Sequence, residues 1–493
     1  MPDYVLSIDA GTTGITSLLV DHSGQIVSRA YREFPSYFPA PGWVEQDPLQ
    51  IWDATVATAA AALGNVRANQ LAAIGITDQR ETTVVWERET LRPVHNAIVW
   101  QCRRSADICD ELRLQGFEEE VRARTGLVLD AYFSGTKLTW LARNIEGFTK
   151  RCLAGEIAFG TIDSWIMAKL SDGNIHATDY SNASRTMLFN IHDRVWDPFL
   201  LEKLEVPSQV LPEVLPSSGR FGVTSVNGFL GTEVPISGVA GDQQSALFGQ
   251  ACFTTGMSKN TYGTGSFVLT NTGEAAPISN HGLLTSIAWS IDGRVDYALE
   301  GAIFITGAAV QWLRDGLGVV AHAQDTGPLA ESVTSNEGVY FVPALVGLGA
   351  PWWDQHARGT ITGITRGTTK AHLARAALEA MCYQTKDVID AMAADSGVAM
   401  KELRVDGGAS LNDFVCQFQS DVLQIPVARP KIAETTAMGA AYLAGLAEGF
   451  WESMQDVAER WQLDNLFEPK MSAENASELY EGWTKALERT FSR

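Results

Sequence analysis

The sequence predicts an α/β protein made of two similar domains with a ligand cleft between them. Strand-like apolar runs alternate with helix-length runs along its 493 residues, which is typical of a mixed α/β architecture. The chain also exceeds the size at which one hydrophobic core keeps growing. Residues 4–14 (YVLSIDAGTTG) and 403–408 (LRVDGG) each end a β-rich run with an aspartate and glycines. The backbone N–H groups of such a turn can donate to a phosphate. We therefore expect two like domains to face one nucleotide.

In the N-terminal half the expected elements are short strands and one long helix. They are predicted, in chain order, at 4–9 (strand), 17–22 (strand), 48–63 (helix), 72–78 (strand) and 235–241 (strand). The domain boundary is expected where the last of these strands ends, because a new series of β-rich runs begins soon after it. We therefore predict an N-terminal domain over residues 1–248 and a C-terminal domain over residues 249–493. Each is expected to hold its own sheet and one phosphate turn.

The C-terminal half is predicted to combine strands at 340–345 and 359–365 with two helices. The first helix covers 371–395, and its apolar positions fall on one face: Leu373, Ala377, Met381, Val388 and Met392. The second covers 435–449 and is rich in alanine, glycine and leucine. This composition fits a buried helix in close packing as well as it fits a functional element.

Composition restricts the partners that the chain can have. With 45% hydrophobic and 19% charged residues it resembles an ordinary globular protein, and its net charge of −21 repels nucleic acid and anionic membranes. ATP is still permitted, because a phosphate site is built from local backbone dipoles and Mg²⁺. Neither a signal-peptide pattern nor a run of about 18 apolar residues occurs, so we expect a cytoplasmic protein without membrane insertion. The cysteines form no CxxC pair and are expected to be reduced core residues: Cys102, Cys109, Cys152, Cys252, Cys382 and Cys416.

The first glycine-rich turn, residues 9–14, carries the groups that phosphoryl transfer requires. Its backbone N–H groups up to Gly14 and the hydroxyls of Thr12 and Thr13 can donate to phosphate oxygens. Asp9 can hold Mg²⁺, through water molecules bound to the ion. The turn is not a Walker A loop, because no GK[ST] sequence follows. The alternative is a plain hairpin that joins two strands.

Two further turns repeat this pattern in the C-terminal half. Residues 262–266 (YGTGS) present Thr264 between two glycines, although a lone GTG sequence is as often a simple hairpin. Residues 406–412 (DGGASLN) end a strand and open a helix, and their adjacent glycines leave a surface for a flat adenine ring. Asn412 can contact the nucleotide there or serve only as the cap of the helix.

Charged residues follow two of the predicted strands in the N-terminal half. Asp242 and Gln243 stand between a strand and a helix, where a carboxylate can cap the helix or accept a proton from an attacking hydroxyl. Arg80 and Glu81 directly follow the strand at 72–78. They can turn together toward a ligand, with the arginine donating to hydroxyls and the glutamate accepting. The alternative is an exposed ion pair.

Motifs spread over nearly the whole chain are those of one known family. They include PGWVEQDPLQIW (41–52), ITDQRETTVVWE (76–87), SGVAGDQQSALFGQ (237–250), KNTYGTGSF (259–267) and RVDGGASLNDFVCQFQSD (404–421). On these motifs the chain resembles the FGGY carbohydrate kinases, and within them the kinases of glycerol. The resemblance implies an actin- and hexokinase-like (ribonuclease H-like) fold of two α/β domains with an interdomain cleft. It also implies ATP- and Mg²⁺-dependent phosphorylation of glycerol to sn-glycerol 3-phosphate, the first step of glycerol catabolism.

The resemblance implies roles for individual residues as well. Asp242 is the implied general base, and Asp9 and Asp242 are the implied magnesium residues. The implied polyol pocket consists of Arg80, Glu81, Trp100, Tyr132, Asp242, Gln243 and Phe267. The implied nucleotide contacts are Thr12, Thr13, Gly14, Thr264, Gly307, Gln311, Gly408 and Asn412. Aromatic rings would pack on the carbon chain of glycerol, and a larger sugar would leave buried polar groups unpaired.

Some positions depart from the family pattern. Gly14 and Thr16 replace a serine and an arginine of the first loop, which puts part of the transition-state stabilisation in doubt. Glu233 stands where relatives inhibited by fructose 1,6-bisphosphate carry an arginine, so we expect no such inhibition. The region also lacks the histidine that a sugar-transport phosphocarrier phosphorylates in some relatives, so that activation is expected to be absent.

Two alternative functions compete with this interpretation. The first is a kinase of the same family that acts on a pentulose or another polyol, against which the matches at Arg80, Glu81 and Trp100 argue. The second is a non-catalytic sugar or nucleotide sensor, or a filament-forming relative of actin. The intact Asp9, Asp242 and both phosphate loops argue against it. The resemblance also implies a homo-oligomer, a dimer or a tetramer.

Overall fold

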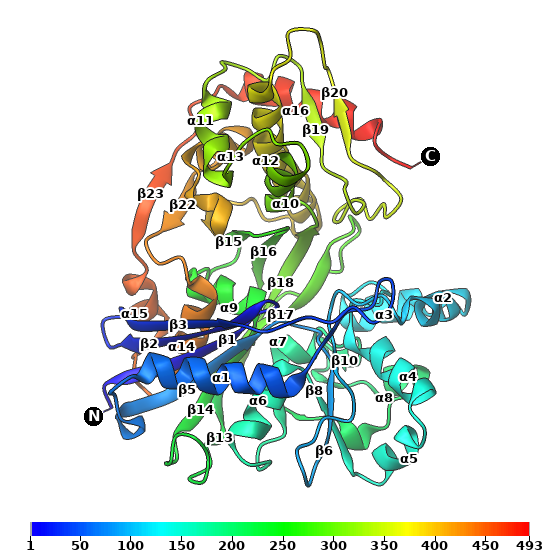
Figure 1. The fold of residues 1–493 in the computed structure, drawn as a ribbon, viewed down its shortest axis with the longest axis vertical. Coiled ribbons are helices and arrows are strands. Elements are labelled where there is room, and N and C mark those ends of the chain that lie inside the picture. Colours follow the sequence, from blue (N-terminus) through cyan, green and yellow to red (C-terminus); the bar gives the residue numbers. More distant parts are fainter. Residues whose placement is uncertain (1, 493) are drawn as a thin grey trace.

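The computed structural model describes residues 2–492, and its centre is a sheet of 13 strands (Figure 1). From edge to edge the strands are β23 (Leu463–Phe467), β22 (Val427–Pro430), β21 (Leu403–Asp406), β15 (Ser258–Tyr262), β16 (Ser266–Gly273), β18 (Arg294–Ile303), β17 (Leu284–Ile291), β13 (Ser218–Val223), β14 (Pro235–Gly241), β5 (Leu71–Asp78), β1 (Tyr4–Ala10), β2 (Gly14–Asp21) and β3 (Ile26–Glu33). The pairs β1–β5, β5–β14, β13–β17, β15–β21 and β21–β22 are parallel, and the other neighbours in the sheet are antiparallel.

The sheet differs from the expectation of one separate sheet in each half. Strands β13 and β17 join the two groups of strands through a single register pair, Ser218 with Ile291. Figure 1 shows the two groups one above the other, with the N-terminal strands in the lower part. The helix α14 (Thr435–Ala447) nevertheless packs against β1, β5 and β14 of the lower group. The two halves of the sequence are therefore interleaved at their junction.

Two of the predicted helices cover opposite faces of the N-terminal strands. The helix α1 (Pro48–Leu63) has the predicted bounds, and the side chain of Asp47 caps it by accepting from the Leu49 N–H group. It packs with Leu6 and Ile8 of β1, whereas α14 packs with Val5 of the same strand. Successive strand residues point to opposite faces, so α1 and α14 enclose the sheet between them.

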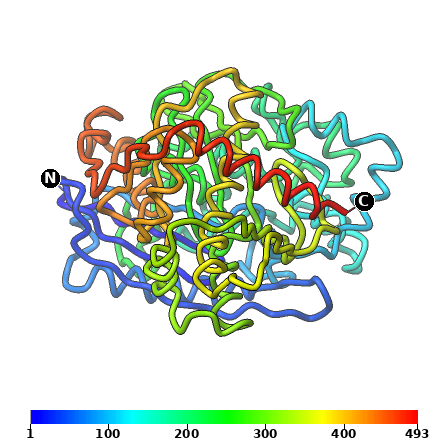
Figure 2. The backbone as a smooth tube through the Cα atoms, turned by 90° about the horizontal axis from the view of Figure 1, so that it is seen from above, coloured from blue at the N-terminus to red at the C-terminus, as the bar shows by residue number. Residues whose placement is uncertain are grey.

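The remaining helices build the C-terminal half. The prediction at 371–395 is confirmed by α12 (Lys370–Ser396), and the predicted buried helix at 435–449 is α14. Figure 2 shows the last helix, α16 (Ala473–Glu488), crossing the outside of this half, where it contacts α12 and α13 (Asp413–Leu423). All six cysteines are buried and free, as expected. None of the helices within residues 2–492 is both long and apolar enough to cross a membrane.

Glycine is required where α9 (Asp242–Gly249) crosses α14. A Cβ atom on Gly439 would lie 1.8 Å from the backbone oxygen of Ser245, and one on Gly249 would lie 1.9 Å from that of Thr435. Backbone atoms cannot move aside as the end of a flexible side chain can. The two helices can therefore approach this closely only with glycine at both positions.

We expect Gly439→Ala to lower the free energy of unfolding by about 3 kcal/mol, the upper end of the usual overpacking cost, because the helix backbones must separate. Urea unfolding measures this loss. The control is Gly367→Ala, whose new Cβ would meet only the Thr365 hydroxyl at 3.7 Å. Equal stability of the two variants would contradict the interpretation of the crossing.

Candidate active site

The first charged residues of the site follow two neighbouring parallel strands. Asp78, the last residue of β5, pairs with Gly241, the last residue of β14. Carboxyl ends of parallel strands meet at one edge of a sheet, so Arg80 lies beside Asp242, the first residue of α9. The Nε atom of Arg80 is 3.0 Å from Oδ1 of Asp242. The structure thus brings together the residues that follow β5 and β14, Arg80 and Asp242.

Glu81 is held in a backbone conformation that few residues adopt. Its φ angle is 62°, in the left-handed region, and its carbonyl oxygen accepts hydrogen bonds from Ser134 Oγ at 3.0 Å and Lys137 Nζ at 2.9 Å. Both donors are buried residues of α4 (Ser134–Asn144). Arg80 and Glu81 are only 2% and 1% exposed, so the alternative of an exposed ion pair is wrong.

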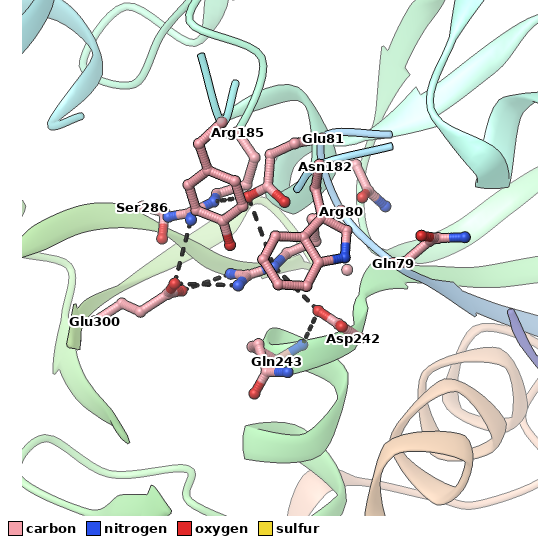
Figure 3. Close-up of polar contacts among 12 residues, drawn as sticks. Gln79, Arg80, Glu81, Asn182, Arg185, Asp242, Gln243, Ser286 and Glu300 are labelled. Carbon is pink, nitrogen blue, oxygen red and sulfur yellow. Dashed lines mark hydrogen bonds and ion pairs between the residues drawn. The ribbon is translucent and has the colours of Figure 1, made fainter. Parts of the chain in front are cut away.

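Arg80 and Glu81 belong to a buried cluster of two arginines and two glutamates (Figure 3). Arg80 donates to Oε2 of Glu300 at 2.5 Å and to its Oε1 at 3.1 Å. Arg185 donates to Oε1 of Glu81 at 2.6 Å and to Oε1 of Glu300 at 3.1 Å. Burial alone would raise the pKa of Glu300, but the charges of Arg185 and Arg80 hold that pKa at about 2. Glu300 therefore stays charged at neutral pH.

Aromatic rings surround this cluster, and each of the three predicted ones is half-buried. The rings of Trp100 and Tyr132 meet edge to face with centroids 5.5 Å apart. The guanidinium of Arg80 lies 6.0 Å from the ring centroid of Phe267 on β16. Trp100 also donates from Nε1 to the hydroxyl of Thr12 at 2.9 Å, which connects the first glycine-rich turn to the aromatic side of the site.

Asp242 is fixed through one of its two carboxylate oxygens. Oδ1 accepts a hydrogen bond from the backbone N–H of Gln243 at 2.7 Å and also faces Arg80, whereas no residue within 2–492 hydrogen bonds to Oδ2. The side chain is 26% exposed, unlike the cluster behind it. The Gln243 side chain is held from the opposite side, since its Oε1 accepts from Lys259 Nζ at 2.5 Å. Asp242 therefore has one positioned carboxylate oxygen that is free to accept a proton.

The first glycine-rich turn joins two antiparallel strands, so the hairpin interpretation describes its connection correctly. β1 pairs with β2 from Ala10 and Ile15 outward, and the turn between them exposes the hydroxyl of Thr13. Asp9 lies at the base of the turn, opposite Thr16 on β2. Burial and the nearby charge of Asp242 raise the pKa of Asp9 to about 7. The two carboxylates thus lie close enough for their charges to interact.

The predicted nucleotide residues of the C-terminal half gather at the ends of three strands. β15, β18 and β21 run in the same direction, and the turns after them carry Thr264, Gly307 and Gly408. Gly307 opens α10 (Gly307–Gln311), and its N–H donates to the carbonyl of Gly263 at 3.1 Å. The exposed Gln311 ends the same helix.

Asn412 has the capping role that was one of its two alternatives, and its contact with a nucleotide stays a prediction. It caps α13, since its Oδ1 accepts from the Phe414 N–H at 3.1 Å, so capping is confirmed. It also follows the exposed Gly408 by one turn of 3₁₀ helix. Gly407 packs so closely on β15 that a Cβ there would lie 2.4 Å from the Tyr262 carbonyl oxygen. Gly407 therefore allows this turn to approach the end of β15, where the GTG turn begins.

Three charged residues of the site are not predicted from the sequence: Arg185, Lys259 and Glu300. Each occurs in a segment that is otherwise apolar or neutral, and Glu300 interrupts the buried strand β18. An isolated charge in a buried strand requires a partner, and this signal could have identified Glu300. Arg185 and Lys259 carry no comparable local signal. Glu233, the other position singled out in the sequence, is exposed between β13 and β14, and its effect on inhibition stays a prediction.

Known proteins resemble this chain over its whole length. Residues 4–249 match the N-terminal domain and residues 258–448 the C-terminal domain of the FGGY family of carbohydrate kinases. The glycerol kinase of Petrotoga mobilis is 57% identical over 491 residues, which cover 99% of this chain and 98% of that protein. That of Geobacillus kaustophilus is 57% identical over 489 residues, covering 99% of both.

Solved structures agree with this likeness. The structure of Plasmodium falciparum glycerol kinase with ADP has a TM-score of 0.94 and 33% sequence identity, covering 99% of this chain and 98% of that one. A xylulose kinase of Lactobacillus acidophilus, 22% identical, has the same fold with a TM-score of 0.86. The predicted actin- and hexokinase-like fold is thus confirmed. On its sequence and its fold, the chain belongs to the FGGY family of carbohydrate kinases.

Proposed function

We propose that this protein is a glycerol kinase, which transfers the γ-phosphoryl group of ATP to glycerol and forms sn-glycerol 3-phosphate. The observation that carries the proposal is the position of Asp242, with one carboxylate oxygen fixed by Arg80 and Gln243 and the other free. Behind it lies a small, fully buried cluster of polar groups, and aromatic rings lie on its sides. Such a site suits a substrate with few carbon atoms and several hydroxyls.

In the proposed reaction, Asp242 accepts the proton of a terminal hydroxyl of glycerol. The hydroxyl oxygen attacks the γ-phosphorus in line, and the bond from phosphorus to the β–γ bridging oxygen breaks, releasing ADP. Arg80, Glu81 and Gln243 orient the hydroxyls, while Trp100, Tyr132 and Phe267 enclose the carbon chain. Thr12, Thr13 and the N–H of Gly14 contact the phosphates on one side and Thr264 on the other. Gly307, Gln311, Gly408 and Asn412 hold the rest of the nucleotide.

Asp9 and Asp242 fit a magnesium site in this proposal. Mg²⁺ in kinases is held by one or two carboxylates, waters and the substrate phosphates, so a larger cluster of acidic residues is not required. Accordingly, no group of three or more potential metal ligands occurs within residues 2–492. Burial and the charge of Asp242 raise the pKa of Asp9, and a cation shared by the two carboxylates would offset this repulsion. Bound Mg²⁺ would neutralise charge that develops on the phosphates.

A pH dependence follows from this pair. Asp9 has a pKa of about 7 without the cation, so it must lose its proton before it can hold Mg²⁺. Protonation then competes with the metal below pH 7, and the apparent dissociation constant for Mg²⁺ should be about tenfold larger at pH 6 than at pH 8. Titration of activity with Mg²⁺ at saturating ATP and glycerol tests this. In Asp9→Asn the dependence should disappear, and its persistence there would assign the effect to another group.

The decisive experiment for the proposed function is ADP release in a coupled assay with ATP·Mg²⁺. We expect release to depend on glycerol, which would also show that Gly14 and Thr16 support phosphoryl transfer in the first loop. Release that follows xylulose or ribulose instead would assign the chain to the pentulose kinases. ATP turnover that ignores every polyol would favour the sensor alternative.

The proposal extends to the organisation and location of the protein. We propose domains over residues 1–248 and 249–493, a homo-oligomer that is a dimer or a tetramer, and a cytoplasmic location. Support comes from the two family domains matched at 4–249 and 258–448 and from the full-length likeness to bacterial glycerol kinases. Light scattering coupled to gel filtration would measure the number of subunits.

A further inference from the structure

Glu300 connects the two halves of the chain inside the site. It lies in the middle of β18, within the segment that matches the C-terminal family domain, and its side chain has no exposed surface. Its partners Arg80 and Arg185 belong to the segment that matches the N-terminal domain. A carboxylate with this burial and two arginine partners is costly to retain unless its position matters.

The contacts of Glu300 determine which edge of Arg80 is free. A guanidinium group presents two edges on which two N–H groups lie side by side. Glu300 occupies the edge formed by Nη1 and Nη2, with Oε2 and Oε1 at 2.5 and 3.1 Å. The other edge consists of Nε–H and the second hydrogen of Nη2. Nε faces Asp242 at 3.0 Å, and no residue within 2–492 accepts from the second Nη2 hydrogen.

Arg185 in turn prevents Glu300 from moving. It donates to Oε1 of Glu300 and, through Nε, to Oε1 of Glu81. Its guanidinium also lies 5.3 Å from the ring centroid of Phe133, a distance at which a cation–π contact adds to its restraint. Two arginines and two glutamates thus form one cluster in which both carboxylate oxygens of Glu300 accept from arginine (Figure 3).

We propose that Glu300 is a positioning residue for polyol recognition, which directs the free edge of Arg80 toward a hydroxyl of the substrate. This inference rests on the proposed function, in which Arg80 binds glycerol and Asp242 is the base. Without Glu300, the carboxylate nearest to Arg80 is that of Asp242, because Oε1 of Glu81 is 3.9 Å from Nε. If Arg80 formed two hydrogen bonds to Asp242, they would occupy the free edge of Arg80 and also the Asp242 oxygen that accepts the proton.

The test is Glu300→Gln, which keeps the shape of the side chain but removes its charge and one accepting oxygen. Losing a charge-assisted hydrogen bond on Arg80 should raise KM for glycerol by about 10- to 100-fold and lower kcat less than that. KM for ATP·Mg²⁺ should change by less than about twofold, because the nucleotide residues lie on other turns. Isothermal titration with glycerol alone should show the same loss of affinity without any turnover.

A second measurement concerns the hydroxyls themselves. Propane-1,2-diol and propane-1,3-diol each lack one hydroxyl of glycerol. The wild-type protein should disfavour the diol that lacks the hydroxyl facing Arg80, and in Glu300→Gln this discrimination should shrink by about tenfold. Unchanged discrimination in the folded variant would overturn the assignment, as would equal losses for glycerol and ATP·Mg²⁺.

The matched control is Glu379→Gln. Glu379 is also a buried glutamate, 1% exposed, which accepts from Arg375 at 2.7 Å and from Asn336 at 2.8 Å, away from the site. It should alter stability without a selective change in KM for glycerol. If Glu300→Gln does not fold, Arg185→Lys replaces it, because lysine keeps the charge but lacks the separate Nε and Nη2 atoms with which Arg185 reaches Glu81 and Glu300. A folded Arg185→Lys protein with normal KM for glycerol would overturn the proposal.

Failure of the proposed function has a different signature. If the wild-type protein itself neither binds nor phosphorylates glycerol, the function is wrong and Glu300 does not position a glycerol-binding arginine. If the wild type phosphorylates glycerol and Glu300→Gln does so with unchanged KM, only the positioning role is wrong.

Discussion

Replacing Asp242 with asparagine is expected to abolish turnover, with kcat reduced by about 10³-fold, because general-base catalysis contributes 10²–10⁴. The substitution preserves shape, and its amide oxygen can still accept from the Gln243 N–H and face Arg80. Glycerol and ATP should therefore still bind with affinities close to those of the wild type. The initial rate of ADP formation gives kcat, and isothermal titration calorimetry gives the affinities for glycerol and ATP.

The control for this prediction is Asp292→Asn. Asp292 is an exposed carboxylate with φ at 49°, a conformation that asparagine adopts readily, and it lies in the turn between β17 and β18. The Asp292→Asn protein should keep the turnover and the substrate binding of the wild type. Near-normal turnover in Asp242→Asn would remove Asp242 from the role of base, whereas loss of glycerol binding together with turnover would show that its charge is needed to bind glycerol.

Much of the site could be predicted because its residues stand at strand ends. Arg80, Asp242 and Thr264 each follow a β-rich run within a few residues, and parallel strands bring such positions together. The local sequence is therefore enough to place them at one edge of the sheet. The same holds for Asn412, because the strand, the glycines and the helix that follows predict that it caps that helix.

The partners of these residues could not be predicted in the same way. Glu300 and Arg80 are 220 positions apart, and Arg185 and Glu300 are 115 apart. No periodicity or turn pattern connects such distant positions, and only the packed sheet brings them together. The continuous sheet has the same origin, because it depends on one register pair between β13 and β17. Expectations based on local patterns failed where two distant segments had to meet.

Removing Arg80 should separate the electrostatic and the functional roles of the cluster. Arg80→Met leaves Glu300 and Glu81 with Arg185 alone, so the cluster has two negative charges and one positive charge in a buried position. Breaking a buried pair in this way should lower the free energy of unfolding by about 3 kcal/mol. It should also lower kcat/KM for glycerol by about 10²–10³-fold, because the substrate loses its charged donor.

The double variant Arg80→Met/Glu300→Gln makes the distinction measurable. It restores one positive and one negative charge, Arg185 with Glu81, so most of the lost stability should return in urea unfolding. Activity should not return, because no side chain replaces the donor edge of Arg80. Recovery of both quantities together would mean that the arginine contributes only by balancing charge. Recovery of stability without activity would show that the donor edge of Arg80 recognises the substrate, separately from the charge that Arg80 balances in the cluster.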